Sequence, residues 1–261
     1  MNSTVQKTIY ANVLLAYPLD QEFTYCFNED QPIKIGSIAE VSFRNKNYLG
    51  VVISISNQTQ IKNKKIKSIQ KISNYLLSKK NIKFLEWVSS YNLIPRGIVL
   101  RMILPKSEGY FIKDDDSKNS QDLLSPKYLK LNETQSKARA KIERIFLQND
   151  YSTILLDGMP GSGKTEVYFD LIAKNISSKK QSLILFPEVS LTNEFIKRVE
   201  ERFGCAPDIW HSKITPTKKR QIIERVISGK SQILIGARSA LFLPFKNLGL
   251  LIVDEEHDSS Y

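Results

Sequence analysis

Residues 158–165 read Gly-Met-Pro-Gly-Ser-Gly-Lys-Thr and match the phosphate-loop (P-loop) pattern G-x-x-x-x-G-K-[S/T]. In such a loop the glycines let the backbone bend tightly and turn its N–H groups toward phosphate oxygens. The lysine reaches the β and γ phosphates, and the final hydroxyl binds Mg²⁺. The pattern therefore predicts a nucleotide site in which Lys164 is the catalytic, phosphate-binding cation. The other residues expected to bind the nucleotide are Gly158, Gly161, Ser162, Gly163 and Thr165, the last also as a Mg²⁺ ligand.

The flanking residues decide whether the loop is functional, because the motif is meaningful where it follows a strand and opens a helix. Residues 153–156 form a short β-branched and apolar run, which predicts the strand. Residues 166–173 are rich in helix formers, and their apolar positions suit a helix packed on a sheet. A glycine-rich turn without a ligand is the alternative, and the paired signals disfavour it.

A second polar group, Asp254-Glu255-Glu256-His257, follows the apolar run 250–253. In parallel α/β sheets ligands bind beyond the carboxyl ends of the strands, which is also where a phosphate loop lies. Asp254 is then the expected acidic partner of Mg²⁺, and Glu255 the catalytic residue that polarises the attacking water. The alternative is a strand that runs out into an acidic surface turn. For His257, a role limited to hydrogen bonding with the carboxylates stays open.

Charge and composition narrow the class of protein. The 261 residues carry a formal net charge of +11, which favours a polyanionic partner because clustered Lys and Arg displace counterions from phosphate backbones. A solvated lysine surface is the alternative. The two cysteines, Cys26 and Cys205, are isolated, so neither a thiolate zinc site nor a disulfide framework is indicated. No run approaches the ~18 apolar residues that span a bilayer, so we expect a cytoplasmic protein without a membrane partner.

Residues 1–105 are expected to form a small β-rich domain. Short runs rich in β-branched and aromatic residues predict an antiparallel barrel or sandwich. These runs are 8–17, 23–27, 37–43 and 48–55, with turns at Gly36 and 45–47. The lysine-rich run 62–71 follows; it is either a strand that points Ile66 and Ile69 inward and lysines toward a phosphate backbone, or a solvated edge strand.

Aromatic residues of this domain allow two interpretations. Phe23 and Tyr25 share one face of their strand and either stack an unpaired base or belong to the core. Residues 81–92 predict an amphipathic helix, and residues 97–104 form a second apolar segment. The buried stripe expected on the helix is Ile82, Leu85, Val88 and Tyr91, extended by Trp87.

The composition turns polar over residues 106–128, which we expect to be a linker. The second domain, 129–261, begins with a helix capped by Asn132. Further apolar strands alternate with helices, which predicts an α/β fold with a parallel sheet covered on both faces. The expected strands are 183–186, 207–211, 233–235 and 250–253, and the expected helices are 191–203, ended by Gly204, and 215–228, ended by Gly229.

Several blocks of the second domain together resemble the first, RecA-like lobe of superfamily 2 helicases, with Asp-Glu-Glu-His as a variant of the DEAD/DEAH box. They are similar, more closely, to the primosomal protein N′ (PriA) family of replication-restart DNA helicases. The blocks are 158–168, 187–192, 210–212, 236–242 and 254–261. The N-terminal domain is similar in plan through residues 23–25, 41–43, 50–52 and 66–69.

The resemblance implies a first domain that binds the 3′ end of a nascent strand at a stalled fork, and a second that is half of an ATP-driven 3′-to-5′ motor. It points to Phe23, Thr24, Tyr25 and Lys67 for the terminal nucleotide and to Gln135 for adenine. It also implies that Arg238 and the block 187–192 lie near DNA or the coupling path. The implied cofactors are ATP and Mg²⁺. The implied partners are forked DNA, other primosome proteins and single-strand DNA-binding protein.

The chain departs from the family pattern at several positions. Thr24 stands where an acidic residue is common, and Arg44 where a glycine is usual. The family's winged-helix domain is absent or reduced to residues 106–128. The second motor lobe with its arginine finger and the cysteine-rich zinc insertion have no counterpart before Tyr261, so zinc is expected only in a missing C-terminal part.

We therefore expect a helicase fragment, a hydrolase by family, that binds ATP and DNA but does not unwind DNA. The rival hypothesis is a non-motor DNA-end-binding module or loader scaffold. A third hypothesis, the motor subunit of a restriction enzyme, is disfavoured by the first domain and the block 236–242.

Overall fold

The computed structural model describes residues 8–61, 66–104, 108–111, 127, 130–148, 151–187 and 192–258. These residues form two compact units. The first unit comprises Met1–Asp116, Thr215–Ser228 and Leu241–Lys246, and the second comprises Ser117–Ile214, Gly229–Ala240 and Asn247–Tyr261. Each unit has its own hydrophobic core.

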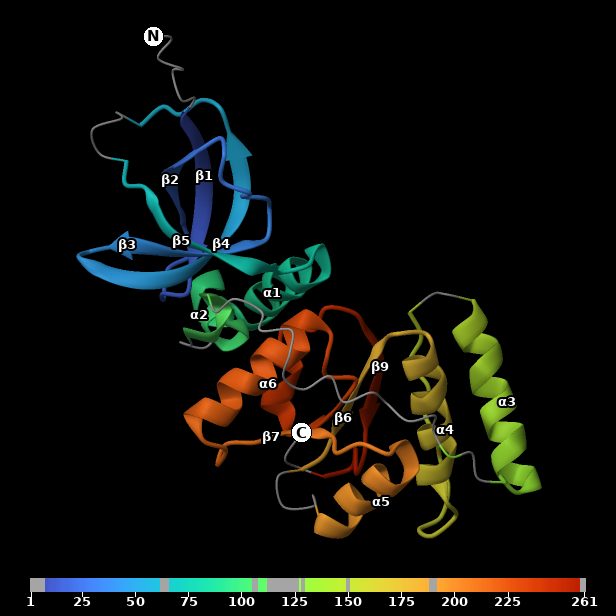
Figure 1. The fold of residues 1–261 in the computed structure, drawn as a ribbon. Helices are drawn as coiled ribbons and strands as arrows, with labels where there is room; N and C mark the ends of the chain where they lie inside the picture. The colour runs from blue at the N-terminus through green and yellow to red at the C-terminus, as the bar shows by residue number, and fades with distance from the viewer. Residues whose placement is uncertain are drawn as a thin grey trace. The chain divides into compact units, whose positions relative to one another are not determined.

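The first unit contains a five-stranded antiparallel sheet of strand order β2-β1-β4-β3-β5 (Figure 1). Its strands are β1 (Thr8–Leu15), β2 (Glu22–Asn28), β3 (Ser37–Phe43), β4 (Lys46–Ser56) and β5 (Ile69–Leu76). The two outer strands approach each other where Cys26 forms a parallel bridge with Ser68, and the N–H of Cys26 donates to the Lys67 carbonyl at 3.0 Å. The sheet therefore curls toward a barrel, and the predicted antiparallel β-rich domain is confirmed.

The turn between β3 and β4 lies at Arg44 and Asn45, one residue earlier than predicted. Both residues have positive φ, 46° and 59°. Positive φ at both central positions defines the type I′ turn, whose twist matches the flanking strands. Arg44 adopts this conformation at the cost of Cβ crowding, about 1–2 kcal/mol for a non-glycine residue.

Two helices, α1 (Lys79–Asn92) and α2 (Arg96–Ile103), follow the sheet. Leu85 and Val88 of α1 are buried, as predicted. Trp87 and Tyr91 are 58% and 74% exposed, so the prediction that they extend the buried stripe is wrong. Instead the two rings stack on each other at 5.3 Å. The stripe is narrower because α2 packs against only one side of this helix.

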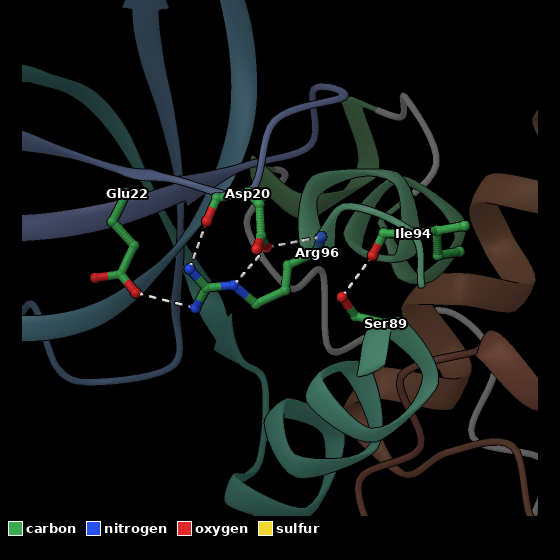
Figure 2. A network of polar contacts seen from close by, with 5 residues as sticks. All are labelled: Asp20, Glu22, Ser89, Ile94 and Arg96. Atoms are coloured by element: carbon green, nitrogen blue, oxygen red, sulfur yellow. Dashed lines mark hydrogen bonds and ion pairs between the residues drawn. The ribbon is translucent and has the colours of Figure 1, made fainter. Parts of the chain in front are cut away.

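An ionic network ties α2 to the segment before β2 (Figure 2). The Arg96 guanidinium donates to Asp20 Oδ1 at 2.9 Å, to the Asp20 carbonyl at 2.6 Å and to Glu22 Oε1 at 3.1 Å. Next to it, Gly97 lies so close to the chain leaving β1 that an added Cβ would be 1.8 Å from the Tyr17 carbonyl oxygen. The network and this close approach fix the entry into β2, the strand that carries Phe23, Thr24 and Tyr25.

The short helix η2 (Glu108–Phe111) contacts β5 and the later helix α6 (Pro216–Ser228) within the first unit. Tyr110 of η2 is buried, and its carbonyl accepts a hydrogen bond from Ser73 of β5. The prediction of an unpacked linker is therefore wrong for these four residues, because an aromatic side chain anchors them. Most of the remaining predicted linker lies outside the described residues.

The second unit contains a four-stranded parallel sheet of strand order β7-β8-β6-β9 (Figure 1). Its strands are β6 (Gln181–Leu185), β7 (Asp208–Trp210), β8 (Ile233–Gly236) and β9 (Leu248–Val253). Its helices are α3 (Glu133–Leu147), α4 (Lys164–Ser177) and α5 (Asn193–Phe203), and η3 (Arg238–Phe242) follows β8. Every residue of β6 is buried, as expected for a strand covered on both faces, and the predicted α/β fold is confirmed.

The strand predicted at residues 153–156 is not formed. The backbone there is irregular, Leu155 is exposed, and β9 is the outer strand of the sheet. Leu156 packs instead against the cluster that Ile142 of α3 and Val167 and Leu171 of α4 form. Part of the apolar run 153–156 therefore packs on helices. Its sequence pattern fits helix packing and strand pairing equally well, so the pattern alone could not decide between them.

Buried charges connect the three helices of the second unit. Asp170 of α4 accepts a hydrogen bond from Arg139 of α3, and its other oxygen lies 4.0 Å from Arg202 of α5. Asp170 and Arg202 are only 4% and 5% exposed. Lys174 of α4 pairs with Glu143 of α3, and this pairing lowers the pKa of Glu143. The helix that begins at the phosphate loop is thus held on both sides by ion pairs.

Candidate nucleotide site and DNA-binding surface

The loop at 158–163 opens a helix as predicted, but the strand expected before it is not formed, so the support for phosphate binding comes from the loop itself. Gly161 and Gly163 have φ of 77° and 81°, in the left-handed region that glycine adopts at little cost. Helix α4 begins directly afterwards at Lys164, and its N-cap, Gly163, makes no side-chain capping bond. No cap side chain therefore competes with an anion for the N–H groups of Lys164 and Thr165, whereas the Glu166 N–H donates to the Gly163 carbonyl at 3.1 Å; the positive end of the helix dipole also attracts an anion.

Lys164 lies at the loop itself. Its Nζ donates to the Gly158 carbonyl at 2.7 Å, so the ammonium is held beside the glycine backbone where the phosphates are expected. A Cβ on Gly158 would come within 2.9 Å of Ser162 Oγ. Gly158, Ser162 and Lys164 therefore lie close together, as expected for residues of one phosphate-binding loop.

Gln135 of α3 contacts the same loop. Its Nε2 donates to the Ser162 carbonyl at 3.1 Å, and its Oε1 accepts from the Asn132 N–H at 2.9 Å in a capping box. One N–H and one lone pair of the amide remain for a ligand, which is the set that a bidentate contact with an adenine edge uses. The predicted N-cap at Asn132 is confirmed, and the cap orients Gln135 toward Gly163.

The acidic turn lies at the carboxyl end of β9. The Asp254 N–H donates to the Leu185 carbonyl at 3.0 Å, which continues the parallel ladder with β6. The Tyr168 hydroxyl donates to Asp254 Oδ2 at 2.8 Å and also hydrogen-bonds with the Thr165 side chain. Burial and the neighbouring Asp254 charge raise the pKa of Tyr168, so its hydroxyl stays protonated as a donor. The two predicted Mg²⁺ ligands, Thr165 and Asp254, therefore meet at one tyrosine.

Tyr168 was not among the predicted site residues. Its position three residues after Thr165 places it on the same side of α4, but helical spacing alone marks it as a core residue. Only the tertiary fold shows that its hydroxyl reaches the acidic turn.

Glu255 has a strained backbone with φ of 54°, and its N–H donates to Asp254 Oδ1 at 3.0 Å. Non-glycine residues in this region cluster at functional sites, where the surrounding structure holds them. His257 Nε2 lies 3.4 Å from Glu255 Oε2, so the histidine is placed as a hydrogen-bond partner of the carboxylate.

These residues fit a Mg²⁺–nucleotide complex. Within the described ranges no group of three or more His, Cys, Asp or Glu side chains is arranged to hold a metal ion. A single hydroxyl and a single carboxylate suit Mg²⁺, because Mg²⁺ is usually held by one or two protein oxygens together with substrate phosphates and water. When bound, Mg²⁺ would neutralise phosphate charge, with Thr165 and Asp254 as its protein partners.

In the first unit, the side chains of Phe23, Tyr25 and Lys67 all contact the end of β3, at Ser42 and Phe43. The Tyr25 hydroxyl donates to the Ser42 carbonyl at 3.2 Å, and Lys67 Nζ lies 3.4 Å from Ser42 Oγ. The Phe23 ring packs on Phe43 at 4.6 Å. Tyr25 is buried, which raises its pKa to about 12, whereas Lys67 is exposed. The accessible groups here are the Lys67 ammonium and the partly exposed edge of Phe23.

Thr24 does not join this group. Its Oγ1 donates to Asn12 Oδ1 at 2.9 Å, on the other face of the sheet from Phe23 and Tyr25. Arg44, by contrast, extends over the Phe43 ring at 5.3 Å, and the same ring packs against Phe23. The charged groups beside the aromatic rings therefore include Lys67 and Arg44. Lys67 was a predicted site residue, whereas Arg44 was not.

Arg238 is exposed and follows the end of β8 by two residues, at the carboxyl edge of the sheet where Asp254 also lies. Of the predicted block 187–192, residues 188–191 lie outside the described part of the chain. The structure thus places Arg238 at the carboxyl edge of the sheet, and its contact with DNA stays a prediction.

Comparison with known proteins identifies the class. Residues 12–105 match the family model described as the 3'DNA-binding domain (3'BD), and residues 132–261 match the model described as DEAD/DEAH box helicase. The chain is thus a helicase-family protein with a 3′-DNA-binding domain.

Its curated relatives are named Replication restart protein PriA, and the chain belongs to the PriA family. The protein from Rickettsia conorii is 37% identical over 246 residues, which cover 94% of this chain and 36% of the relative. That from Helicobacter pylori J99 is 32% identical over 90% of this chain and 35% of the relative. That from Bacillus subtilis is 38% identical over 51% of this chain and 16% of the relative. The chain thus spans about a third of the length of the first two. None of the described helices has the length and apolar character needed to cross a membrane.

Proposed function

We propose that this chain carries the DNA-end-binding domain and the first motor lobe of an ATP-dependent 3′-to-5′ DNA helicase that acts in replication restart. The observation that carries the proposal is the meeting of the phosphate loop and the acidic turn at Tyr168. The Thr165 hydroxyl and the Asp254 carboxylate meet there, and Lys164 lies on the loop that precedes Thr165; nucleotide hydrolysis uses these three kinds of group. The family matches supply the class of reaction.

In this function Lys164 and the first N–H groups of α4 bind the phosphates, and Gln135 contacts the base. Glu255, held beside Asp254 by its own N–H, orients the attacking water. Bound Mg²⁺ supplies charge neutralisation at the phosphates. Thr165 and Asp254 present the oxygen atoms for it.

The first unit is proposed to bind the 3′-terminal nucleotide at Phe23, Tyr25 and Lys67. The stacking surface of Phe23 tolerates any base, and the Lys67 ammonium is placed for the sugar or phosphate end. Thr24 faces Asn12, so we propose no base contact for it. The net charge of +11 supports association with a polyanion.

Tested by themselves, these 261 residues are proposed to bind nucleotide and DNA but to unwind DNA negligibly. In other phosphate-loop enzymes an added arginine contributes ~10³–10⁵ in rate by stabilising transition-state charge, and related helicases take theirs from a second lobe. Forked DNA, primosome proteins, single-strand DNA-binding protein, a cytoplasmic location and zinc bound beyond these residues are proposed by resemblance to the family. ATP-dependent strand displacement by the 261 residues would contradict the lack of unwinding.

Nucleotide affinity tests the motor proposal against a DNA-end-binding module without a motor. Lys164→Ala is expected to abolish binding of a fluorescent ATP analogue. Lys137→Ala is the matched control, because Lys137 lies on the exposed surface of α3, where it pairs with Glu133. Equal affinity of Lys164→Ala and the wild type would support the non-motor module.

Binding of labelled single strands tests the DNA-end proposal. Lys67→Ala is expected to remove any preference for a 3′-hydroxyl end over a 3′-phosphate end, while the exposed Lys34→Ala keeps it. The slope of log K against log salt is expected to fall by about 0.7 for the lost contact to a single strand. An unchanged end preference in Lys67→Ala would refute the assignment of this site.

A further inference from the structure

Tyr168 combines burial with a polar contact to the nucleotide site. Its side chain is 6% exposed and its ring packs edge-on against Phe169 at 5.4 Å in the core of the second unit. A phenylalanine ring would pack equally well at this core position, so packing does not explain why the residue has a hydroxyl. Its donor is spent on Asp254 Oδ2 at 2.8 Å, and it also bonds with the Thr165 side chain.

The Tyr168 hydroxyl can contact both predicted Mg²⁺ ligands at the same time. A tyrosine hydroxyl donates once and accepts as well, so it donates to Asp254 while it accepts from the Thr165 hydroxyl. Asp254 Oδ1 is held by the Glu255 N–H at 3.0 Å. Both carboxylate oxygens of Asp254 are thus held by hydrogen bonds from the protein, and Thr165 Oγ1 keeps its lone pairs while it donates.

We propose that Tyr168 is a positioning residue that orients Thr165 and Asp254 together toward the Mg²⁺ of a bound nucleotide. The proposal rests on the proposed function of this site and names a residue that acts through the two ligands. Groups that hold metal ligands in this way change metal affinity by about 10- to 100-fold when they are removed. Because the hydroxyl joins α4 to the end of β9, it also aligns the loop with the acidic turn before any ligand binds.

A merely structural role of Tyr168 gives a different expectation. If the hydroxyl only satisfied a buried polar group, its removal would change stability and would weaken nucleotide binding equally with and without Mg²⁺. If it positions the Mg²⁺ ligands, its removal weakens only the Mg²⁺-dependent part of nucleotide affinity. The Mg²⁺ dependence of binding therefore separates the two roles.

The test titrates a fluorescent ATP analogue onto the 261-residue chain, first in excess EDTA and then over a series of Mg²⁺ concentrations. Tyr168→Phe keeps the ring, and we expect its affinity in EDTA to stay within about twofold of the wild type. The Mg²⁺ concentration needed for half of the affinity gain is expected to rise about 10-fold or more. Tyr110→Phe is the matched control, since Tyr110 is also buried, its hydroxyl has no hydrogen-bond partner among the described residues, and it belongs to the first unit.

An unchanged Mg²⁺ dependence in Tyr168→Phe, or an equal loss of affinity in EDTA and in Mg²⁺, would overturn the proposal and leave the proposed function intact. Absence of Mg²⁺-dependent binding by the wild type would overturn both. Asp254→Asn provides a second route if Tyr168→Phe folds poorly. Asp254→Asn and the milder variant Thr165→Ser are each expected to weaken the Mg²⁺ dependence of nucleotide binding. The loss in the double variant should differ from the sum of the two single losses, because both ligands depend on one hydroxyl. Additive losses would contradict the proposal.

Discussion

Asp170→Ala is expected to be among the most destabilising substitutions in the second unit. The carboxylate lies between two guanidinium groups, accepting from Arg139 and facing Arg202 at 4.0 Å. The side chain of Arg139 is a third exposed and keeps Glu143 at 3.7 Å. Arg202 is 5% exposed, so loss of the facing carboxylate leaves its charge in a region that water does not reach.

The magnitude follows from the burial of this pair. Removal of one partner of a buried ion pair costs about 3–5 kcal/mol, mainly because the other charge stays desolvated. The alanine also leaves a small cavity, which adds to the loss. For a unit of this size the change corresponds to a fall of roughly 10–20 °C in the melting temperature. An exposed pair such as Lys137–Glu133 contributes only about 0.3–0.5 kcal/mol.

Urea denaturation of the full chain, followed by circular dichroism, measures the loss. Since the chain has two units, the transition that shifts must be the one assigned to the second unit. Lys137→Ala serves as the exposed control. The double variant Asp170→Leu/Arg202→Met should recover much of the stability, because apolar side chains of similar volume replace buried ion pairs well. A loss below about 1 kcal/mol for Asp170→Ala, or a double variant no more stable than the single one, would refute the reasoning.

Three further substitutions follow from the same structure. Gly97→Ala is expected to destabilise the first unit by about 1–3 kcal/mol or more in urea denaturation, because its Cβ would collide with backbone at 1.8 Å. Hydrogen bonds from the guanidinium in Figure 2 lower the pKa of Asp20, so its contribution to stability is present above the ordinary carboxyl value and is lost as the pH falls through the lowered value. Asp20→Asn should therefore flatten the acid limb of the stability curve by less than about 1 kcal/mol, as the group is exposed. Gly163→Ala should weaken binding of a fluorescent ATP analogue more than Gly161→Ala does: both positions have positive φ, but only a Cβ on Gly163 comes within 2.3 Å of the Gln135 amide nitrogen. Equal effects of the two glycine substitutions would show that the contact with Gln135 is not important for binding.

Local sequence signals predicted the parts of the fold that local energetics determine. The cap at Asn132 and the C-terminal stop at Gly204 are formed as expected, the latter with φ of 72°. Each depends on one residue and the backbone within a turn of it, so the pattern contains the needed information. The antiparallel and parallel sheets were also predicted, because strand length and alternation with helices differ between the two halves.

The incorrect predictions concern choices that depend on distant residues. Trp87 and Tyr91 have the spacing of a buried stripe, but nothing in their own helix specifies how wide a face its neighbours cover. Residues 153–156 have a strand pattern, but Leu156 packs on two helices instead. Tyr168 was missed for the same reason, since its hydroxyl partner Asp254 is 86 residues away in the chain.

The buried ion pairs and the nucleotide site are linked through two helices. Arg139 lies one turn after Gln135 on α3, and Asp170 follows Tyr168 by two residues on α4. The pair therefore fixes how the helix that carries the adenine-contact candidate lies against the helix that begins at the phosphate loop. Because the Gln135 amide reaches Ser162 only in this arrangement, loosening the pair should lower nucleotide affinity as well as stability. The ion pair between Arg139 and Asp170 thus stabilises the second unit and also maintains the distance between Gln135 and the phosphate loop, which are proposed to contact opposite ends of one nucleotide.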